Sequence, residues 1–347
     1  MSIGPKSSIH TGDRYSVSYL TSQADKVTAS VHVLAEGEKS LPTVILLSGL
    51  AVTWFDWQDV VHYLSSTHRV LVIDRAGSGL SGPAPFAQGS TVANEVDVVR
   101  QILDIFEIDS ATVVGHSMGG LLAEAFARTH PTRCDRIVLL DTSFEQTADA
   151  RWTQLPTTKD NDAAPEESAE TMSSLRERLA HVNVPLPALT ELMTRQARAI
   201  LTSSPVVARL VAAIRTHTKG TPLETAKRAD ELRVSRAVFT RKHILEGMVR
   251  EYASYDAWIR ELDELREATR MPVPWIVVAA QGNPKFVGDR WVRKLERLAD
   301  GLRAENPHTA GAFEVVSASH MLMRDCPADI AALIRGETSE EGGHLPA

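Results

Sequence analysis

Hydrophobic and polar positions alternate near the N-terminus and then give way to short, continuous apolar runs. Residues 14–37 contain two stretches of period-two alternation, which predict a β-hairpin. The later runs are rich in Val, Ile and Leu, which is typical of parallel strands buried on both faces. These runs are residues 43–49, 70–74, 111–115, 136–141, 275–280 and 313–317.

Helical patterns separate several of these predicted strands. Val92, Val96, Val99 and Leu103 recur at three- and four-residue spacing and so lie on one face of a helix. A second helix is predicted from residue 121 to residue 129, where His130-Pro131 ends it. This alternation of strands and helices predicts an α/β fold with a doubly wound, mostly parallel sheet.

The pattern changes between residues 145 and 270, where charged, helix-forming sequence dominates. Helices are expected at 173–180, 188–217, 223–232 and 237–269. We therefore expect a core in two parts, residues 1–144 and 271–336, an all-helical insertion over 145–270, and an acidic tail over 337–347.

Composition narrows the class of protein. Of the 347 residues, 43% are hydrophobic and 23% charged, as in ordinary globular proteins, and the net charge of −7 argues against general nucleic-acid binding. The sequence contains no apolar run long enough to span a membrane and no secretory h-region, so a cytoplasmic location is expected. Cys134 and Cys326 form neither a disulfide framework nor a metal-ligand cluster, and we expect free buried thiols.

The segment 111–120 carries the strongest chemical signal. A β-branched run enters Gly115-His-Ser117-Met-Gly119, and a helical pattern follows at once. A strand, a tight turn and a helix are what a nucleophile elbow requires, with glycines that let the strand and helix approach closely. The bare G-x-S-x-G pattern is common, so its partners matter. Ser117 is the predicted nucleophile.

A serine nucleophile needs a base and an acid that orients the base. Among the twelve histidines, only His320 lies in a loop directly after the last predicted strand. His116 is expected to be structural. Seven histidines are assigned to surface or helix positions, namely His32, His62, His130, His181, His217, His243 and His308. Two acids preserve the order Ser…Asp…His. Asp141 ends its strand directly and is preferred, while Asp289 lies near the start of a helix predicted over residues 291–298 and remains the alternative.

The backbone amides of Met118 and Leu50 are the predicted oxyanion-hole donors. Met118 follows the nucleophile, and Leu50 follows the strand that ends at Ser48-Gly49. Trp54 is the candidate substrate-pocket residue because it lies close to this loop. Its neighbours Phe55 and Trp57 fit packing against the sheet at least as well.

These stretches together resemble the α/β-hydrolase superfamily over residues 40–144 and 270–336. Gly115–Gly120 resembles its nucleophile elbow, Asp74–Ser81 its D-x-x-G-x-G-x-S segment, and residues 317–327 its catalytic-histidine loop. The insertion matches the helical cap of that family in position and character, without a shared motif.

Two departures from the family pattern affect the site. The oxyanion strand normally ends in His-Gly, where this chain has Ser48-Gly49. Many members place their acid in a G-x-x-D motif, but here Gly282 is followed by Asn283-Pro-Lys285. Some members carry the acid after the preceding strand instead. The lack of an aspartate in this motif therefore favours Asp141 as the acid.

The resemblance implies a capped, esterase-like serine hydrolase. It implies a Ser117-His320-Asp141 triad that cleaves a small or medium hydrophobic carboxylic ester, with no metal or cofactor and a small-molecule acyl substrate. Epoxide hydrolases and haloalkane dehalogenases of this fold use an aspartate at the elbow, so Ser117 disfavours both activities. Hydrolysis of amides, lactones or C–C bonds, or ligand binding without catalysis, remain alternatives. The sequence leaves the oligomeric state open.

Overall fold

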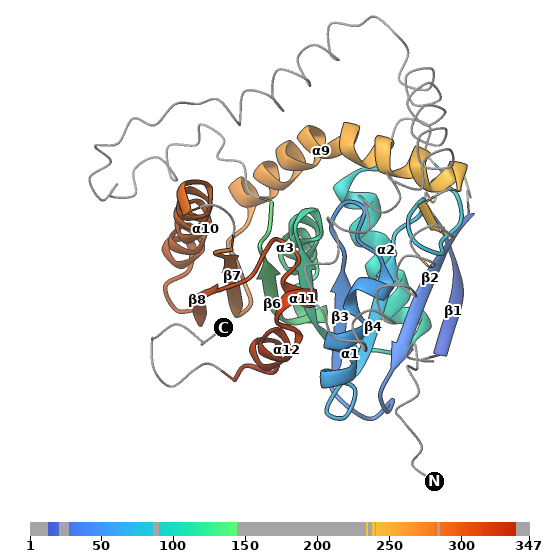
Figure 1. Ribbon diagram of the computed structural model, residues 1–347, viewed down its shortest axis with the longest axis horizontal. Coiled ribbons are helices and arrows are strands. Elements are labelled where there is room, and N and C mark those ends of the chain that lie inside the picture. The colour runs from blue at the N-terminus through green and yellow to red at the C-terminus, as the bar shows by residue number, and fades with distance from the viewer. Residues whose placement is uncertain are drawn as a thin grey trace, which may run out of the picture.

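An eight-stranded sheet forms the centre of the computed structural model (Figure 1). The structure describes residues 13–20, 28–85, 90–143, 234, 238–239, 241–282 and 285–337. The spatial order of the sheet is β1-β2-β4-β3-β5-β6-β7-β8. The strands are β1 (Asp13–Leu20), β2 (Thr28–Glu36), β3 (Thr43–Leu47), β4 (Arg69–Asp74), β5 (Ala111–His116), β6 (Cys134–Leu140), β7 (Trp275–Ala280) and β8 (Gly311–Val316).

Strand direction follows the pattern predicted from the sequence. β1 and β2 form an antiparallel hairpin, and β2 also pairs antiparallel with β4. The pairs from β4 through β3, β5, β6 and β7 to β8 are all parallel. Every residue of β3, β4 and β7 is buried, as the continuous apolar runs require. The doubly wound α/β class is therefore confirmed.

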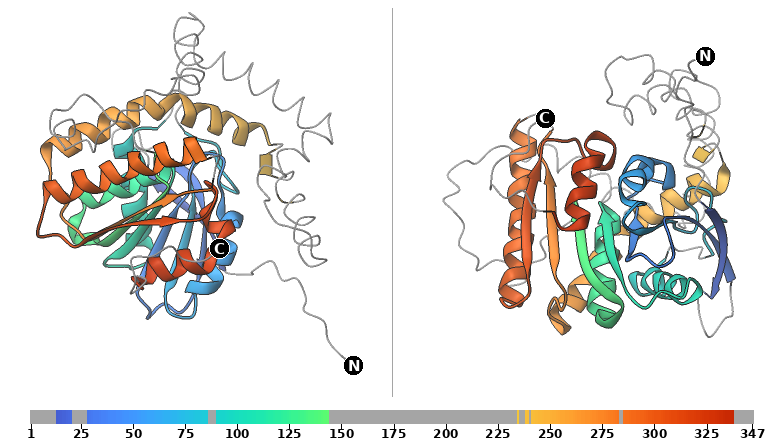
Figure 2. Two further views of the ribbon diagram at one scale, coloured as in Figure 1. Left: turned by 60° about the vertical axis from the view of Figure 1, so that its left-hand side comes forward. Right: turned by 90° about the horizontal axis from the view of Figure 1, so that it is seen from below.

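Helices cover both faces of the sheet. One apolar cluster includes residues of α1 (Gln58–Leu64), α11 (Leu322–Asp325) and α12 (Pro327–Arg335). The other includes residues of α2 (Val92–Ile105), α3 (Met118–Thr129) and α10 (Lys285–Glu305). Helix α9 (Lys242–Ala268) contributes Ile244 to the first cluster and its later residues to the second. Figure 2 shows α1 and α12 on one side of the strands and α2 and α3 on the other. Along β3, Val44 and Leu46 face the first cluster and Ile45 and Leu47 the second.

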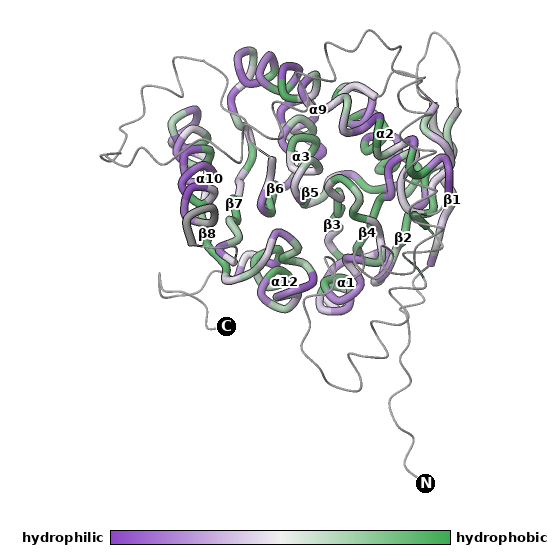
Figure 3. Tube along the Cα trace, turned by 45° about the horizontal axis from the view of Figure 1, so that its top comes forward, coloured by the Kyte–Doolittle hydropathy of each residue, from purple (hydrophilic) through white to green (hydrophobic). Residues whose placement is uncertain are grey.

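The hydropathy of the chain follows these layers. In Figure 3 the inner strands are largely hydrophobic, whereas α10 and α12 alternate hydrophilic and hydrophobic residues along their length. Two short 3₁₀ turns, Trp54–Trp57 and Pro131–Arg133, complete the described elements. No helix in the described part of the chain is long and apolar enough to cross a membrane.

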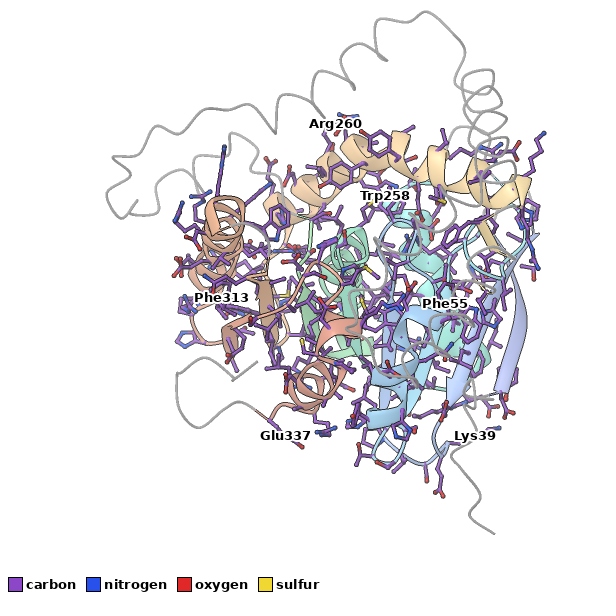
Figure 4. The ribbon with its side chains drawn as sticks, in the orientation of Figure 1. Lys39, Phe55, Trp258, Arg260, Phe313 and Glu337 are labelled. Atoms are coloured by element: carbon purple, nitrogen blue, oxygen red, sulfur yellow. The ribbon has the colours of Figure 1, made fainter. Side chains whose placement is uncertain are left out.

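Helix α9 packs against the helices that cover the sheet. Trp258 is fully buried in the cluster shared with α2 and α3, and its indole Nε1 donates to the Ser90 carbonyl at 2.7 Å. Figure 4 shows Trp258 on the side of α9 that faces the rest of the molecule and Arg260 on the opposite side. The other helices expected at 173–232 lie outside the described residues, so the boundaries of the insertion stay a prediction.

Candidate active site

Ser117 occupies a strained turn between β5 and α3. Its φ and ψ are 52° and −123°, a region that non-glycine residues rarely adopt. The Ser117 amide donates to the Leu140 carbonyl at 3.1 Å, which fixes the turn against the end of β6. Strain of this kind persists only where the surroundings hold it, and it gathers at functional sites.

Glycines make this turn possible. A Cβ on Gly115 would lie 2.4 Å from the Gly119 carbonyl oxygen, and a Cβ on Gly119 would lie 2.3 Å from the carbonyl oxygen of Leu47. Both contacts are with backbone atoms, so neither is relieved by moving a side chain. The close approach of strand and helix that the elbow motif predicts is therefore present.

A short contact joins His320 to Asp141. Nδ1 of His320 lies 2.5 Å from Oδ2 of Asp141. The other carboxylate oxygen, Oδ1, accepts from the Ala280 amide at 3.0 Å and from the Trp291 indole at 2.7 Å. Asp141 is 3% exposed, whereas the His320 side chain is 47% exposed. The carboxylate is thus fixed by three partners, and the imidazole extends from it towards solvent.

The alternative acid has a different partner. Asp289 lies in α10, where its Oδ1 accepts from Nε2 of Gln281 at 3.1 Å in an exposed contact. Of the two carboxylates predicted from the sequence, the structure brings that of Asp141 to His320. Trp291, which the sequence predicted only as part of a helix, contributes by holding Asp141; its spacing in the sequence gave no signal of this contact.

His116 supports the loop that carries His320. Its Nε2 lies 2.7 Å from the His320 carbonyl oxygen, and the two imidazole centroids are 4.7 Å apart. A carbonyl only accepts, so Nε2 carries the proton. Burial, reinforced by the nearby His320, lowers the pKa of His116 well below its ordinary value. The ring is therefore neutral and structural, as the sequence predicted.

The predicted oxyanion donors flank the elbow. Met118 is the first residue of α3, and a first-turn amide has no acceptor within its own helix. On the other side, a Cβ on Gly49 would lie 2.7 Å from Cβ of Ser117, so the loop after β3 contacts Ser117. Leu50 follows Gly49 in a turn closed by the Val52 amide and the Gly49 carbonyl at 3.3 Å, with Ala51 at φ 59°.

Ser48 stands where the resembling family usually has histidine. Its hydroxyl accepts from the Trp57 indole at 2.9 Å. The side chain is 2% exposed, so it belongs to the packing beneath the loop. The departure in sequence therefore leaves the backbone of Ser48 and Gly49 in contact with the elbow.

Trp54, the predicted pocket residue, lies in the 3₁₀ turn before α1. It is 2% exposed, and its ring packs edge-on against Phe55 and His32 at centroid distances of 6.0 and 5.9 Å. Its amide donates to Oδ1 of Asp74 at 2.8 Å. The structure thus places the ring in the core cluster on the α1 face, and a role in substrate binding stays a prediction.

Asp74 organises the segment that leads away from β4, and it corrects one expectation. Its Oδ2 lies 2.9 Å from Nδ1 of His32 and accepts from the Leu80 amide at 3.0 Å. His32 was predicted at a surface or helix position, but it is 7% exposed on β2. The prediction was wrong because the face of β2 that carries His32 is covered by the 3₁₀ turn, whose Trp54 ring lies 5.9 Å from the imidazole between centroids.

Sequence comparison finds relatives that match over part of the chain. This chain is 31% identical over 117 residues to epoxide hydrolase B of Mycobacterium tuberculosis, and the aligned stretch covers 33% of each protein. It is 30% identical over 114 residues to the cis-3-alkyl-4-alkyloxetan-2-one decarboxylase of Shewanella oneidensis, which covers 32% of this chain and 35% of the relative. The matched stretch spans about a third of the length of these curated relatives.

Structure and family comparisons extend the likeness to most of the chain. The crystal structure of Cfl2 from Burkholderia cenocepacia is similar at a TM-score of 0.60 and 16% identity, over 89% of this chain and 92% of that one. At this identity the likeness concerns the fold. The family model described as alpha/beta hydrolase fold matches residues 42–287, well over half of the chain. The chain therefore belongs to the alpha/beta hydrolase fold family.

Proposed function

We propose that this member of the family is a serine hydrolase that cleaves small or medium hydrophobic carboxylic esters through an acyl-enzyme. The contact between His320 Nδ1 and Asp141 Oδ2 at 2.5 Å carries the proposal. It joins a half-exposed imidazole to a buried, fixed carboxylate. The strained Ser117 lies at the end of the neighbouring β5, and its amide bonds to the strand that Asp141 terminates.

The chemistry proceeds in two stages. In the first, His320 takes the Ser117 proton as its Oγ attacks the ester carbonyl, and Asp141 stabilises the imidazolium that forms. The tetrahedral oxyanion accepts from the Met118 and Leu50 amides. The imidazolium then protonates the departing alkoxide, which leaves as the alcohol.

In the second stage water replaces the alcohol. His320 takes a proton from the attacking water, a second tetrahedral intermediate forms, and its collapse releases the acid and returns the proton to Ser117. All these steps use side chains and main-chain amides of this chain.

The relatives do not carry their activities over to this chain. Epoxide hydrolase B and the oxetanone decarboxylase match over about a third of their length, and their names describe different chemistry. The family resemblance assigns an aspartate nucleophile to epoxide hydrolases, whereas this elbow carries Ser117. An ester is the substrate class that a serine nucleophile, a histidine base and an oxyanion hole serve most directly.

The proposal is tested with chromogenic p-nitrophenyl esters of increasing acyl length, together with an amide and a lactone of matched size. The wild-type protein is expected to hydrolyse the short and medium esters fastest. Ser117→Ala is expected to lose more than about 10³-fold in kcat because the nucleophile is gone. Turnover that is the same in wild type and Ser117→Ala would overturn the proposal, and faster turnover of the amide or lactone would reassign the substrate.

A further inference from the structure

A buried arginine that the proposed chemistry does not use lies directly behind the loop after β3. Arg75 follows the last residue of β4 and is 4% exposed. Nη1 of its guanidinium donates to the Ser48 carbonyl, and Nη2 donates to the Gly49 carbonyl at 3.4 Å. One side chain therefore contacts two consecutive carbonyls in the loop that touches Ser117.

These carbonyls determine where the following amides point. The Gly49 C=O and the Leu50 N–H belong to the same peptide unit, which is planar and trans, so the two groups point in opposite directions. A donor that holds the Gly49 oxygen from behind turns the Leu50 N–H away from Arg75. The Val52 amide holds the same oxygen at 3.3 Å, and the contact at Ser48 fixes the preceding peptide in the same way.

The guanidinium is itself fixed from the opposite side. Its Nε donates to Oε1 of Glu251 on α9 at 2.5 Å, in a contact where the Arg75 side chain is 4% exposed and that of Glu251 13%. The planar fork of arginine suits this arrangement because one edge can bind a carboxylate while the other reaches two carbonyls.

Helix α9 lies against the loop that carries Arg75. A Cβ on Gly247 of α9 would lie 2.2 Å from the Gly77 carbonyl oxygen, and Nη1 of Arg250 donates to the Ala84 carbonyl at 3.4 Å. Glu251 therefore projects from a helix that is packed directly on the segment after β4. The position of the guanidinium depends on this packing.

We propose that Arg75, held by Glu251, is a positioning residue that aims the Leu50 amide into the oxyanion hole. The inference rests on the proposed hydrolase function. The positive charge also draws electron density from the Gly49–Leu50 peptide and so strengthens its N–H as a donor. In this protein Arg75 thus supports the loop in which Ser48 replaces the usual histidine.

The test is Arg75→Lys, which keeps a buried positive charge beside Glu251 but replaces the fork with a single ammonium. The readout is kcat for an ester divided by kcat for the matching thionoester. Sulfur accepts hydrogen bonds weakly, so the thionoester draws less on the oxyanion hole. We expect the ester rate to fall about 10-fold or more, because complete loss of one oxyanion donor costs about 10²–10³. The thionoester rate should change much less.

Arg128→Lys is the matched control, because Arg128 is also buried and paired with glutamate, at the far end of α3. Its ester-to-thionoester ratio should stay at the wild-type value even if thermal stability falls. If Arg75→Lys does not fold, Glu251→Ala is measured in the same way, and it should lower the ratio because the guanidinium loses the carboxylate that anchors it.

The outcomes separate this inference from the proposed function. The positioning role is overturned, and the hydrolase function left intact, if the folded Arg75→Lys variant keeps the wild-type ratio, whether or not its turnover is slower. Where Arg75→Lys does not fold, the same result in Glu251→Ala has the same meaning. If the wild-type protein shows no Ser117-dependent turnover of either substrate, both the positioning role and the hydrolase function are overturned.

Discussion

The contact between Asp141 and His320 makes a prediction that the structure allows us to work through atom by atom. In Asp141→Asn the amide oxygen can replace Oδ1 and keep accepting from the Ala280 amide and the Trp291 indole. The amide NH₂ then faces Nδ1 of His320, where a carboxylate oxygen now lies at 2.5 Å. A donor at this position forces Nδ1 to accept, so the imidazole proton moves to Nε2.

In this tautomer Nε2 of His320 is already protonated, so the imidazole cannot take the proton of Ser117. The equivalent change in a serine protease triad lowers kcat by about 10⁴, and we expect a loss of that order. Stability should fall by only about 1 kcal/mol, because both bonds to Oδ1 remain and one charge-assisted contact weakens. Activity and folding are therefore separable in this variant.

The assay is steady-state hydrolysis of a p-nitrophenyl ester, with the melting temperature of each variant measured alongside. Asp289→Asn is the matched control, because its carboxylate has an exposed contact with Gln281. It should stay within about two-fold of wild type, as a surface contact contributes little. A folded Asp141→Asn within ten-fold of wild-type kcat, or a loss of orders of magnitude in Asp289→Asn, would refute the assignment of the acid.

Two further predictions concern the packing around α9. Burial alone would raise the pKa of Glu124, but Arg266 and Arg128 lower it to about 2. The ionised Glu124 therefore stabilises the fold in full above pH 4.5, and this stabilisation is lost as pH falls towards 2. In urea titrations, the fall in the free energy of unfolding on acidification should be about 3 kcal/mol smaller in Glu124→Gln than in wild type, and parallel curves would contradict this. Gly247→Ala should lower the free energy of unfolding by about 1–3 kcal/mol despite the better helix propensity of alanine, because the new Cβ would lie 2.2 Å from the Gly77 carbonyl oxygen. An unchanged urea midpoint would contradict this.

The strands were predictable because burial on both faces leaves a clear sequence signal. The continuous Val/Ile/Leu runs gave each parallel strand, and the elbow motif required a helix immediately after Ser117. The structure begins α3 at Met118, three residues before the predicted start, because glycines at 119 and 120 hid its first turn. α1 was not given bounds from the sequence, because its seven residues make only about two turns, too few for a helical period to be evident.

Candidate site residues could be predicted where a local sequence motif marks them. Contacts between residues that are distant in the sequence could not be predicted. The elbow and the loop after the last strand identified Ser117 and His320 as candidates from the sequence alone. Asp141 competed with Asp289 because order along the chain fits both. Only folding brings the Trp291 indole to Asp141, and only folding brings Arg75 to the Ser48 carbonyl. No spacing rule relates those pairs.

Reaction of the wild-type protein with a fluorophosphonate, followed by peptide mapping, tests the central claim most directly. Such reagents phosphonylate a serine only when a base activates it. We predict one adduct, on Ser117, that is absent from Ser117→Ala and forms much more slowly in His320→Gln. A folded wild-type protein without an adduct on Ser117, or one that reacts at the same rate after His320→Gln, would contradict the account.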